Sequence, residues 1–125
     1  MANENLLFVI SKEAAEDLSS TKYKVISQDS DGKIEAVAAS TEHPFGILQN
    51  SPVTGEAASI APVGCGGISK LEAGVTIATD AEVSFDADGN AAPALAGKYN
   101  IGICTKGGAD GELIEVLLTP AIVKA

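Results

Sequence analysis

The sequence contains few aromatic residues. They make up 4% of its 125 residues, tryptophan is absent, and there is one methionine. Because 46% of the residues are hydrophobic, the core has to be built from Ala, Val, Ile and Leu. Such side chains fill a thin sandwich or a narrow barrel well, but they provide few large anchors for a ligand pocket.

Positive charge is scarce as well. Eight basic residues stand against 17 acidic ones, which gives a formal net charge of −9. Phosphate contacts depend on clustered Lys and Arg, so we expect no nucleic acid as a direct partner. The negative charge favours solubility and discourages self-association through bare charge repulsion.

Long apolar runs are missing. The stretch Leu6–Ile10 is too short for the apolar region of a signal peptide, and no positive residue precedes it. Nothing approaches the roughly 20 apolar residues of a membrane-spanning helix, so we expect no membrane partner. We therefore expect synthesis in a cytoplasm-like compartment, where Cys65 and Cys104 would be small buried residues, although a disulfide between them stays open.

What the sequence does contain is a repeated order of short motifs. The offset between matched motifs decreases from 58 to 57 to 56 residues along the chain. The matched pairs are Ile10-Ser11-Lys12 with Ile68-Ser69-Lys70, Asp29-Ser30-Asp31-Gly32 with Asp86-Ala87-Asp88-Gly89, Gly46-Ile47 with Gly102-Ile103, and Gly55-Glu56 with Gly111-Glu112. This pattern predicts two copies of one supersecondary unit, at about 10–62 and 68–120. We expect one β domain over 10–125, preceded by an N-terminal arm or first strand at 1–9.

Short apolar and β-branched segments separated by turn residues every 8 to 12 positions indicate an all-β protein. We predict a small β-sandwich or barrel, resembling a β-tulip, made of two similar halves. The one helical pattern, Lys12–Leu18, is under two turns long, so we expect a short turn or at most one short helix there. The expected strands are 6–11, 23–27, 34–37, 45–49, 57–62, 83–85, 90–92, 101–105 and 113–120.

Glycine residues mark two geometric features of these strands. Asp31-Gly32 and Asp88-Gly89 each lie between two strands, which is typical of a hairpin with a type I′ turn. Gly46 and Gly102 lie inside strands, where glycine costs stability, so each indicates a bulge or a close backbone approach.

Metal binding is not predicted. The two Asp-x-Asp-Gly sequences resemble the middle of a calcium loop, but Ala38 and Leu95 occupy the positions that need a bidentate Glu. A tetrahedral zinc site made from His43, Cys65 and Cys104 would be one ligand short.

Catalysis is not predicted either. A Cys–His arrangement needs an orienting group and a pocket, and no signature for either accompanies these three residues. The glycine-rich run 63–67 has neither the Lys nor the following helix of a phosphate-binding loop. We therefore expect no enzyme and no cofactor. A lipoyl- or biotinyl-type carrier domain, with Lys33 at a hairpin tip as the modified residue, stays open as an alternative.

The chain resembles the capsid cement proteins of tailed bacteriophages, also called head decoration or head-stabilising proteins. The resemblance covers about Phe8 to Pro120, and its most specific part runs from Gly46 to Ala58. The motifs that carry it are Ala15-Glu16-Asp17-Leu18, Tyr23 with Val25, Asp31-Gly32-Lys33, Gly46-Ile47-Leu48-Gln49-Asn50 with Pro52, Gly55-Glu56-Ala57-Ala58, Gly67-Ile68-Ser69-Lys70, and Ile114 with Val116-Leu117-Leu118.

This resemblance implies a role on the outer surface of a phage head. Members of the family bind where major capsid protein subunits meet, often as trimers at three-fold positions, and reinforce the expanded shell. Their N-terminal segment, here Ala2 to Val9, often reaches to the capsid lattice as an arm. The family has no catalytic residues to carry over.

The candidate capsid-contact residues are Leu6, Leu7, Phe8 and Val9. This run is suited to adding a strand to a capsid strand, because main-chain bonds give affinity and alternate side chains give register. It is equally suited to being a core strand of the domain itself.

Overall fold

The computed structural model describes residues 2–6 and 9–125, and it contains no helix among them. Ten strands make up the regular structure: β1 (Ile10–Glu13), β2 (Val25–Gln28), β3 (Ile34–Ala36), β4 (Gly46–Leu48), β5 (Ala57–Pro62), β6 (Ile68–Glu72), β7 (Glu82–Phe85), β8 (Ala91–Pro93), β9 (Tyr99–Lys106) and β10 (Leu113–Val123). The prediction of an all-β sandwich with two similar halves is confirmed.

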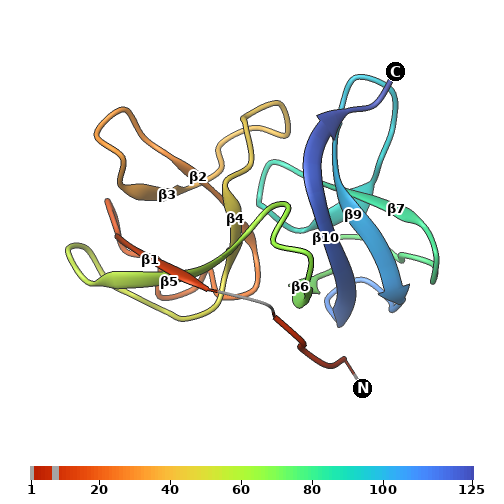
Figure 1. The fold of residues 1–125 in the computed structure, drawn as a ribbon, viewed down its shortest axis with the longest axis horizontal. Coiled ribbons are helices and arrows are strands. Elements are labelled where there is room, and N and C mark those ends of the chain that lie inside the picture. The colour runs from red at the N-terminus through yellow and green to blue at the C-terminus, as the bar shows by residue number, and fades with distance from the viewer. Residues whose placement is uncertain (1, 7–8) are drawn as a thin grey trace.

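The strands form two five-stranded antiparallel sheets that pack against each other (Figure 1). The first sheet has the order β1-β5-β4-β2-β3, and the second has the order β6-β10-β9-β7-β8. Each strand of the first half therefore has a counterpart in the second half at the same place in its sheet.

Both sheets curl so that their outer strands meet. Ala14, just after β1, forms a parallel bridge with Ile34 of β3. Ala73, just after β6, forms the same bridge with Ala91 of β8. Each half is thus a small curled sheet with its own interior.

The apolar core has two parts. A small cluster lies inside the first sheet and consists of Ala14, Leu18, Ile26, Ile34, Leu48, Ala58 and Ile60. A larger cluster joins the other face of the first sheet, represented by Val25, Ile47 and Ala61, to the interior of the second half. The first sheet is therefore covered on both faces, which is why its strands are apolar at consecutive positions such as Ile47-Leu48.

The segment Lys12–Leu18 is not helical. Lys12 and Glu13 end strand β1, opposite Ala58 and Ala57 of β5. Ala14 and Leu18 are then buried in the small cluster, while the backbone N–H of Leu18 donates to the carbonyl of Pro52. Pairing with β5 and burial of these two side chains outweigh the helical propensity of a segment too short to be stable alone.

The register of the repeat differs from the sequence match at its first motif. Ile10 pairs with Ile60, and the counterpart of Ile60 in β10, Val116, pairs with Ser69. Ile10 therefore corresponds to Ser69, an offset of 59 rather than 58, and the shared Ile-Ser-Lys triplets are out of step by one residue. A slip of one residue in a strand exchanges its two faces, so the triplets play opposite roles. The offsets of 57 and 56 further along agree with the pairing.

The two Asp-Gly hairpins are present, but their turns are not type I′. Within each turn only the glycine has a positive φ, 79° at Gly32 and 82° at Gly89. The N–H of Gly32 donates to the carbonyl of Asp29, and the Asp29 carboxylate accepts the N–H groups of Asp31 and Lys33. Asp86 makes the same bonds to Asp88 and Asn90. The first Asp of each motif thus holds a type I turn closed by a left-handed glycine.

Gly46 and Gly102 lie at close backbone approaches, as predicted. A Cβ on Gly46 would lie 2.7 Å from Ile60 Cγ2 and still closer to the carbonyl oxygen of Ala61. On Gly102 it would lie 2.7 Å from Val116 Cγ1 and still closer to the carbonyl oxygen of Leu117. The same crossing occurs in both halves because both sheets have the same order.

Candidate functional site

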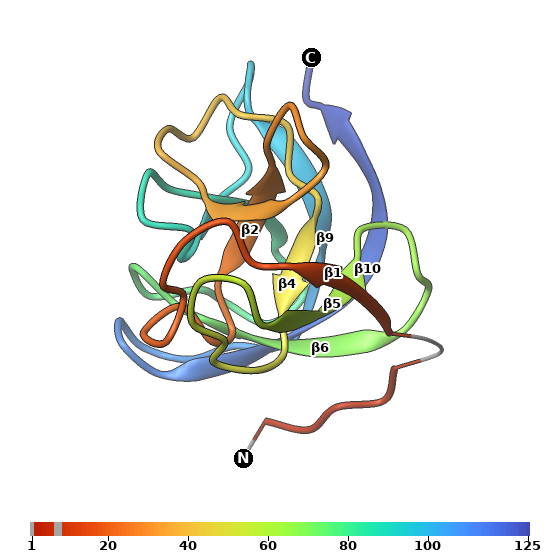
Figure 2. The same ribbon diagram turned by 90° about the vertical axis from the view of Figure 1, so that its left-hand side faces the viewer.

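The N-terminal segment lies along the edge of the second sheet. The backbones of Asn5 and Ile68 exchange two hydrogen bonds of 2.9 Å. The N–H of Asn3 donates to Oε2 of Glu115 at 2.7 Å. Figure 2 shows this segment running beneath β6, apart from the rest of the first half. The segment therefore acts as a short added strand on an otherwise open sheet edge.

The predicted contact run is divided by the structure. Leu6 is half-buried and packs against the larger core cluster, whereas Val9 is 45% exposed. Leu7 and Phe8 lie outside the described residues. Leu6 thus contributes to the fold, and Val9 presents an apolar side chain to the outside.

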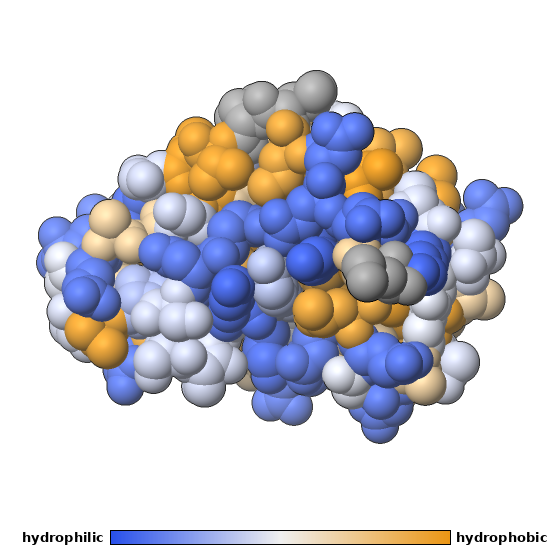
Figure 3. Space-filling model, turned by 90° about the horizontal axis from the view of Figure 1, so that it is seen from below, coloured by the Kyte–Doolittle hydropathy of each residue, from blue (hydrophilic) through white to orange (hydrophobic). Residues whose placement is uncertain are grey.

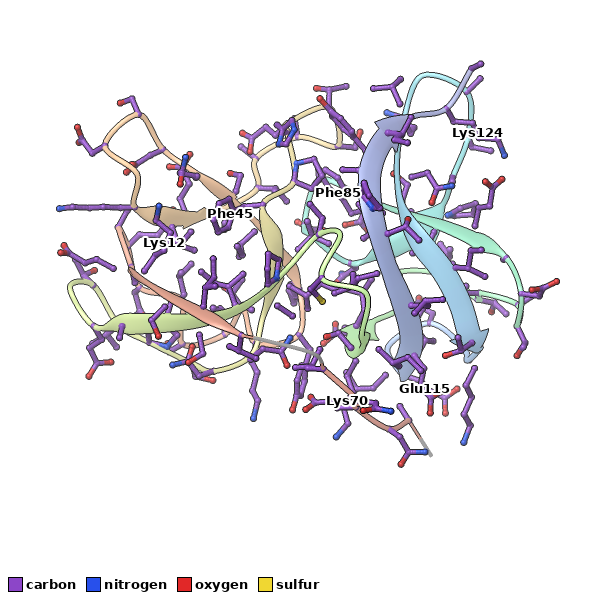
Figure 4. The ribbon with its side chains drawn as sticks, viewed as in Figure 1. Lys12, Phe45, Lys70, Phe85, Glu115 and Lys124 are labelled. Atoms are coloured by element: carbon purple, nitrogen blue, oxygen red, sulfur yellow. The ribbon has the colours of Figure 1, made fainter. Side chains whose placement is uncertain are left out.

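Glu115 is a buried carboxylate that the sequence analysis did not single out. It is 9% exposed and lies near the start of strand β10 (Figure 4). Its two oxygens accept hydrogen bonds from the N–H of Asn3 and from the Thr105 hydroxyl, at 2.7 and 3.0 Å. A charged residue inside the run Leu113–Leu118 was the available signal, because a buried carboxylate needs partners.

Tyr23 is a second residue that the sequence analysis did not mark as unusual. Its φ of 62° is rare for a non-glycine residue, and its ring lies 4.9 Å from Lys22 Nζ and 5.6 Å from Lys70 Nζ. Burial raises the pKa of its hydroxyl, and a hydrogen bond with Glu4 adds to this shift. Tyr23 therefore links the N-terminal segment to both halves.

Lys33, the residue of the carrier alternative, pairs with a neighbouring carboxylate. Its Nζ lies 3.0 Å from Oε2 of Glu13, and this contact raises the pKa of the lysine. It lies just beyond the hairpin turn, at the start of the strand that follows. The pairing gives Lys33 a structural role at the edge of the first sheet.

The three residues of the soft metal or nucleophilic alternative have separate environments. Cys65 and Cys104 are free thiols that are 4% and 1% exposed, and burial raises the pKa of Cys104. His43 is exposed and stacks edge-on against Tyr99 with 5.4 Å between ring centroids. A raised pKa keeps a thiol protonated and unreactive at neutral pH. Within residues 2–6 and 9–125, no group of three or more His, Cys, Asp or Glu side chains is placed to hold a metal ion.

The surface seen from below is largely hydrophilic, and apolar residues gather along one edge of this view (Figure 3). The described chain has no helix that is long and apolar enough to cross a membrane. Large apolar side chains that remain exposed are Val9, Val53, Val75, Leu95, Ile103, Leu113, Ile122 and Val123. Several of them lie on or next to β9 and β10, the long strands of the second sheet.

Comparison with solved structures shows a likeness that spans nearly the whole chain. The chain is similar to the N base of the head fiber gp8.5 of bacteriophage phi29. The TM-score is 0.68, and the match covers 94% of this chain and 98% of that one. At 17% sequence identity, the likeness shows a shared fold. No family model and no curated protein sequence matches the chain.

Proposed function

We propose that this chain is a structural protein of a phage head. It binds the outer surface of the expanded capsid and stabilises the shell by bridging major capsid protein subunits. The observation that carries the proposal is the fold match, because it spans nearly the whole of a domain named as the base of a head fiber. The resemblance of the sequence motifs to those of capsid cement proteins supports the same role.

The N-terminal segment is the proposed contact with the capsid. Residues 3–5 are held by two backbone hydrogen bonds with Ile68, by the bond from Asn3 to Glu115 and by the hydrogen bond between Glu4 and Tyr23. A segment held by a few bonds at a sheet edge can change partners at small cost and add to a strand of a capsid subunit. Leu6, Leu7, Phe8 and Val9 are the residues that would then face the lattice.

The proposal also includes assembly and location. We expect a homotrimer at three-fold positions of the outer capsid surface, made in the cytoplasm of the host bacterium. A net charge of −9 keeps the free protein soluble until it docks.

Binding to expanded heads that lack decoration tests the proposal. Purified protein should saturate the heads at a fixed ratio to the capsid protein and raise the temperature at which the heads open. Val9 and Val53 are both 45% exposed, which makes them a matched pair. Val9→Asp should weaken binding at least tenfold, and Val53→Asp should leave it unchanged.

Failure of the wild-type protein to bind its cognate heads would refute the proposed function. Equal binding by the two valine variants would instead show that the contact with the capsid lies outside the N-terminal segment.

A further inference from the structure

The two halves of the chain contact each other head to tail. One face of the first sheet, with Val25, Ile47 and Ala61, shares a core cluster with Leu71 and Phe85 of the second half. The N–H of Val25 donates to the carbonyl of Gly89 at 2.8 Å, in the turn of the second Asp-Gly hairpin. The N–H of Glu72 donates to the carbonyl of Tyr23 at 2.9 Å. A face of the first half thus packs against an end of the second half.

Both halves have the same fold, so each half has such a face and such an end. The internal contact uses the face of the first half and the end of the second half. The face of the second half and the end of the first half are therefore not used in it. The outer face of the second sheet has Glu82, Ile103 and Leu117 where the first has Val25, Ile47 and Ala61. The outer end of the first half has Lys12 and Gln28 where the second has Leu71 and Phe85. We call these surfaces the outer face and the outer end.

The two surfaces lie at opposite ends of the molecule. In Figure 4, Lys12 of the outer end lies on the left, and Lys124, which forms an ion pair with Glu82 of the outer face, lies at the upper right. One chain therefore cannot join its own outer end to its own outer face.

The backbone next to the outer face has the same conformation as the backbone next to the face of the first sheet that packs against the second half. Asp80 has a φ of 75° and Tyr23 a φ of 62°, both in the left-handed region. Their N–H groups donate to the carbonyls of Cys104 and Leu48, which are counterparts in β9 and β4. This conformation is rare for residues other than glycine, so its occurrence at both positions shows that the two halves share this local geometry.

The outer end has the shape of its counterpart too. Gly32 closes the first Asp-Gly turn with a φ of 79°, as Gly89 closes the second with a φ of 82°. The outer end thus keeps the turn geometry that its counterpart uses in the internal contact.

The two free surfaces carry one pair of opposite charges at matching positions, Lys12 on the outer end and Glu82 on the outer face. A Cβ on Gly89 would lie 2.6 Å from the carbonyl oxygen of Val25, whereas Lys12 Nζ lies 3.7 Å from the same position on Gly32. If a second chain placed Glu82 where Val25 lies in the internal contact, its carboxylate would therefore come next to Lys12. The apolar pair of the internal contact is replaced by a lysine on one side and a glutamate on the other.

We propose that a second copy of this chain docks its outer face onto the outer end of the first and repeats the contact between the halves. Ile103, which is 38% exposed, and Leu117 are covered, and the Glu82 carboxylate pairs with Lys12 of the neighbour. In the single chain, Glu82 binds Lys124 and Asn100, and Lys12 binds Gln28, so docking exchanges these partners. Such a contact joins two different surfaces, so it forms either a closed ring or an open chain.

This inference names the contact through which the proposed trimer forms, and it rests on that part of the proposed function. Charge repulsion between two molecules of net charge −9 opposes association, so the contact is weaker than the internal one. The pairing of Lys12 with Glu82 fixes how the two chains are oriented in this contact.

Charge exchange tests the contact by sedimentation equilibrium of the full chain. Lys12→Glu and Glu82→Lys should each weaken self-association at least tenfold, because each places like charges together. The double variant K12E/E82K should return to within about threefold of wild type, since its reversed charges again attract. Lys22→Glu and Asp110→Lys change the same charges at exposed positions outside the contact and should have little effect.

The outcomes separate the two proposals. A wild-type protein that remains a monomer up to millimolar concentration overturns both the contact and the trimer. A trimer that is insensitive to the single charge reversals, or a double variant that fails to recover while its thermal unfolding matches wild type, overturns the contact alone. Head binding is measured separately, so its failure counts against the capsid role and leaves the contact standing.

Discussion

At the scale of single residues, two glycines control how closely the strands cross. Gly46→Ala and Gly102→Ala should each destabilise the fold by about 2–3 kcal/mol, because the new methyl group meets a backbone carbonyl that cannot move away easily. Gly55→Ala is the control, since its Cβ meets nothing within 4 Å and only the φ of +85° costs energy, about 1 kcal/mol. Denaturant unfolding measures all three, and equal losses would show that the crossings are looser than described.

Glu35 is a carboxylate that the fold disfavours in its charged form. Burial raises its pKa, and the nearby Asp29, Glu42 and Glu16 add to the shift. A group with a raised folded-state pKa contributes stability at low pH that is lost as the pH rises through that pKa. Glu35→Gln should therefore stabilise the protein slightly at pH 7, by less than about 1 kcal/mol, and not at pH 3. Thermal unfolding at both pH values checks this, and a gain that is the same at both would exclude charge as the cause.

At the scale of elements, the first Asp of each Asp-x-Asp-Gly motif stabilises a hairpin. Asp29→Ala should cost about 1–2 kcal/mol, because the N–H groups of Asp31 and Lys33 lose their acceptor. Asp29→Asn keeps an acceptor oxygen and should cost less, and Asp31→Ala should be nearly neutral. If calcium shifted the unfolding midpoint of the wild type but not of Asp29→Ala, the motif would be a metal site instead of a turn.

We expect the N-terminal arm to be separable from the ten strands. Deletion of residues 2–9 leaves β1 intact from Ile10 onward, while it removes the pairing of Asn5 with Ile68 and the packing of Leu6. We expect a loss of about 2 kcal/mol in stability with cooperative unfolding retained, and much weaker binding to heads. Circular dichroism and head co-sedimentation measure the two effects. A truncated protein that no longer folds would assign this segment to the core.

The sequence predicted most of the strands, but it missed β6 and placed the first strand at 6–11 instead of Ile10–Glu13. Alternating apolar residues and Asp-Gly turns indicate strands and hairpins, because these signals are local. The helical pattern at 12–18 forms no helix, since Ala14 and Leu18 are buried by partners far along the chain. The Ile-Ser-Lys match failed because strand register is set by pairing with β5 and β10, which a short motif cannot reveal.

The same limit applies to the candidate site. Val9 is exposed as a contact residue requires, but the burial of Leu6 and the bond from Asn3 to Glu115 depend on where the N-terminal segment lies. Cys104 does correspond to Leu48, as the repeat indicated, because this pair lies where the 56-residue offset agrees with the strand pairing.

At the scale of the whole molecule, one fold occurs twice and its surfaces are used differently. Val25, buried between the halves, corresponds to the exposed Glu82, and the buried Phe85 corresponds to the exposed Gln28. We propose that the halves arose by duplication, with boundaries near 10–62 and 68–120, and that the outward surfaces then became polar. Terminal units of repeat arrays commonly have such polar outer faces.

An image reconstruction of expanded heads mixed with the protein tests directly whether this chain decorates a phage head, as we propose. We expect added density of the size of this domain on the outer surface, where capsid subunits meet, with residues 2–9 reaching a capsid strand. Heads that carry no added density at saturating protein, or density confined to the inside of the shell, would contradict it.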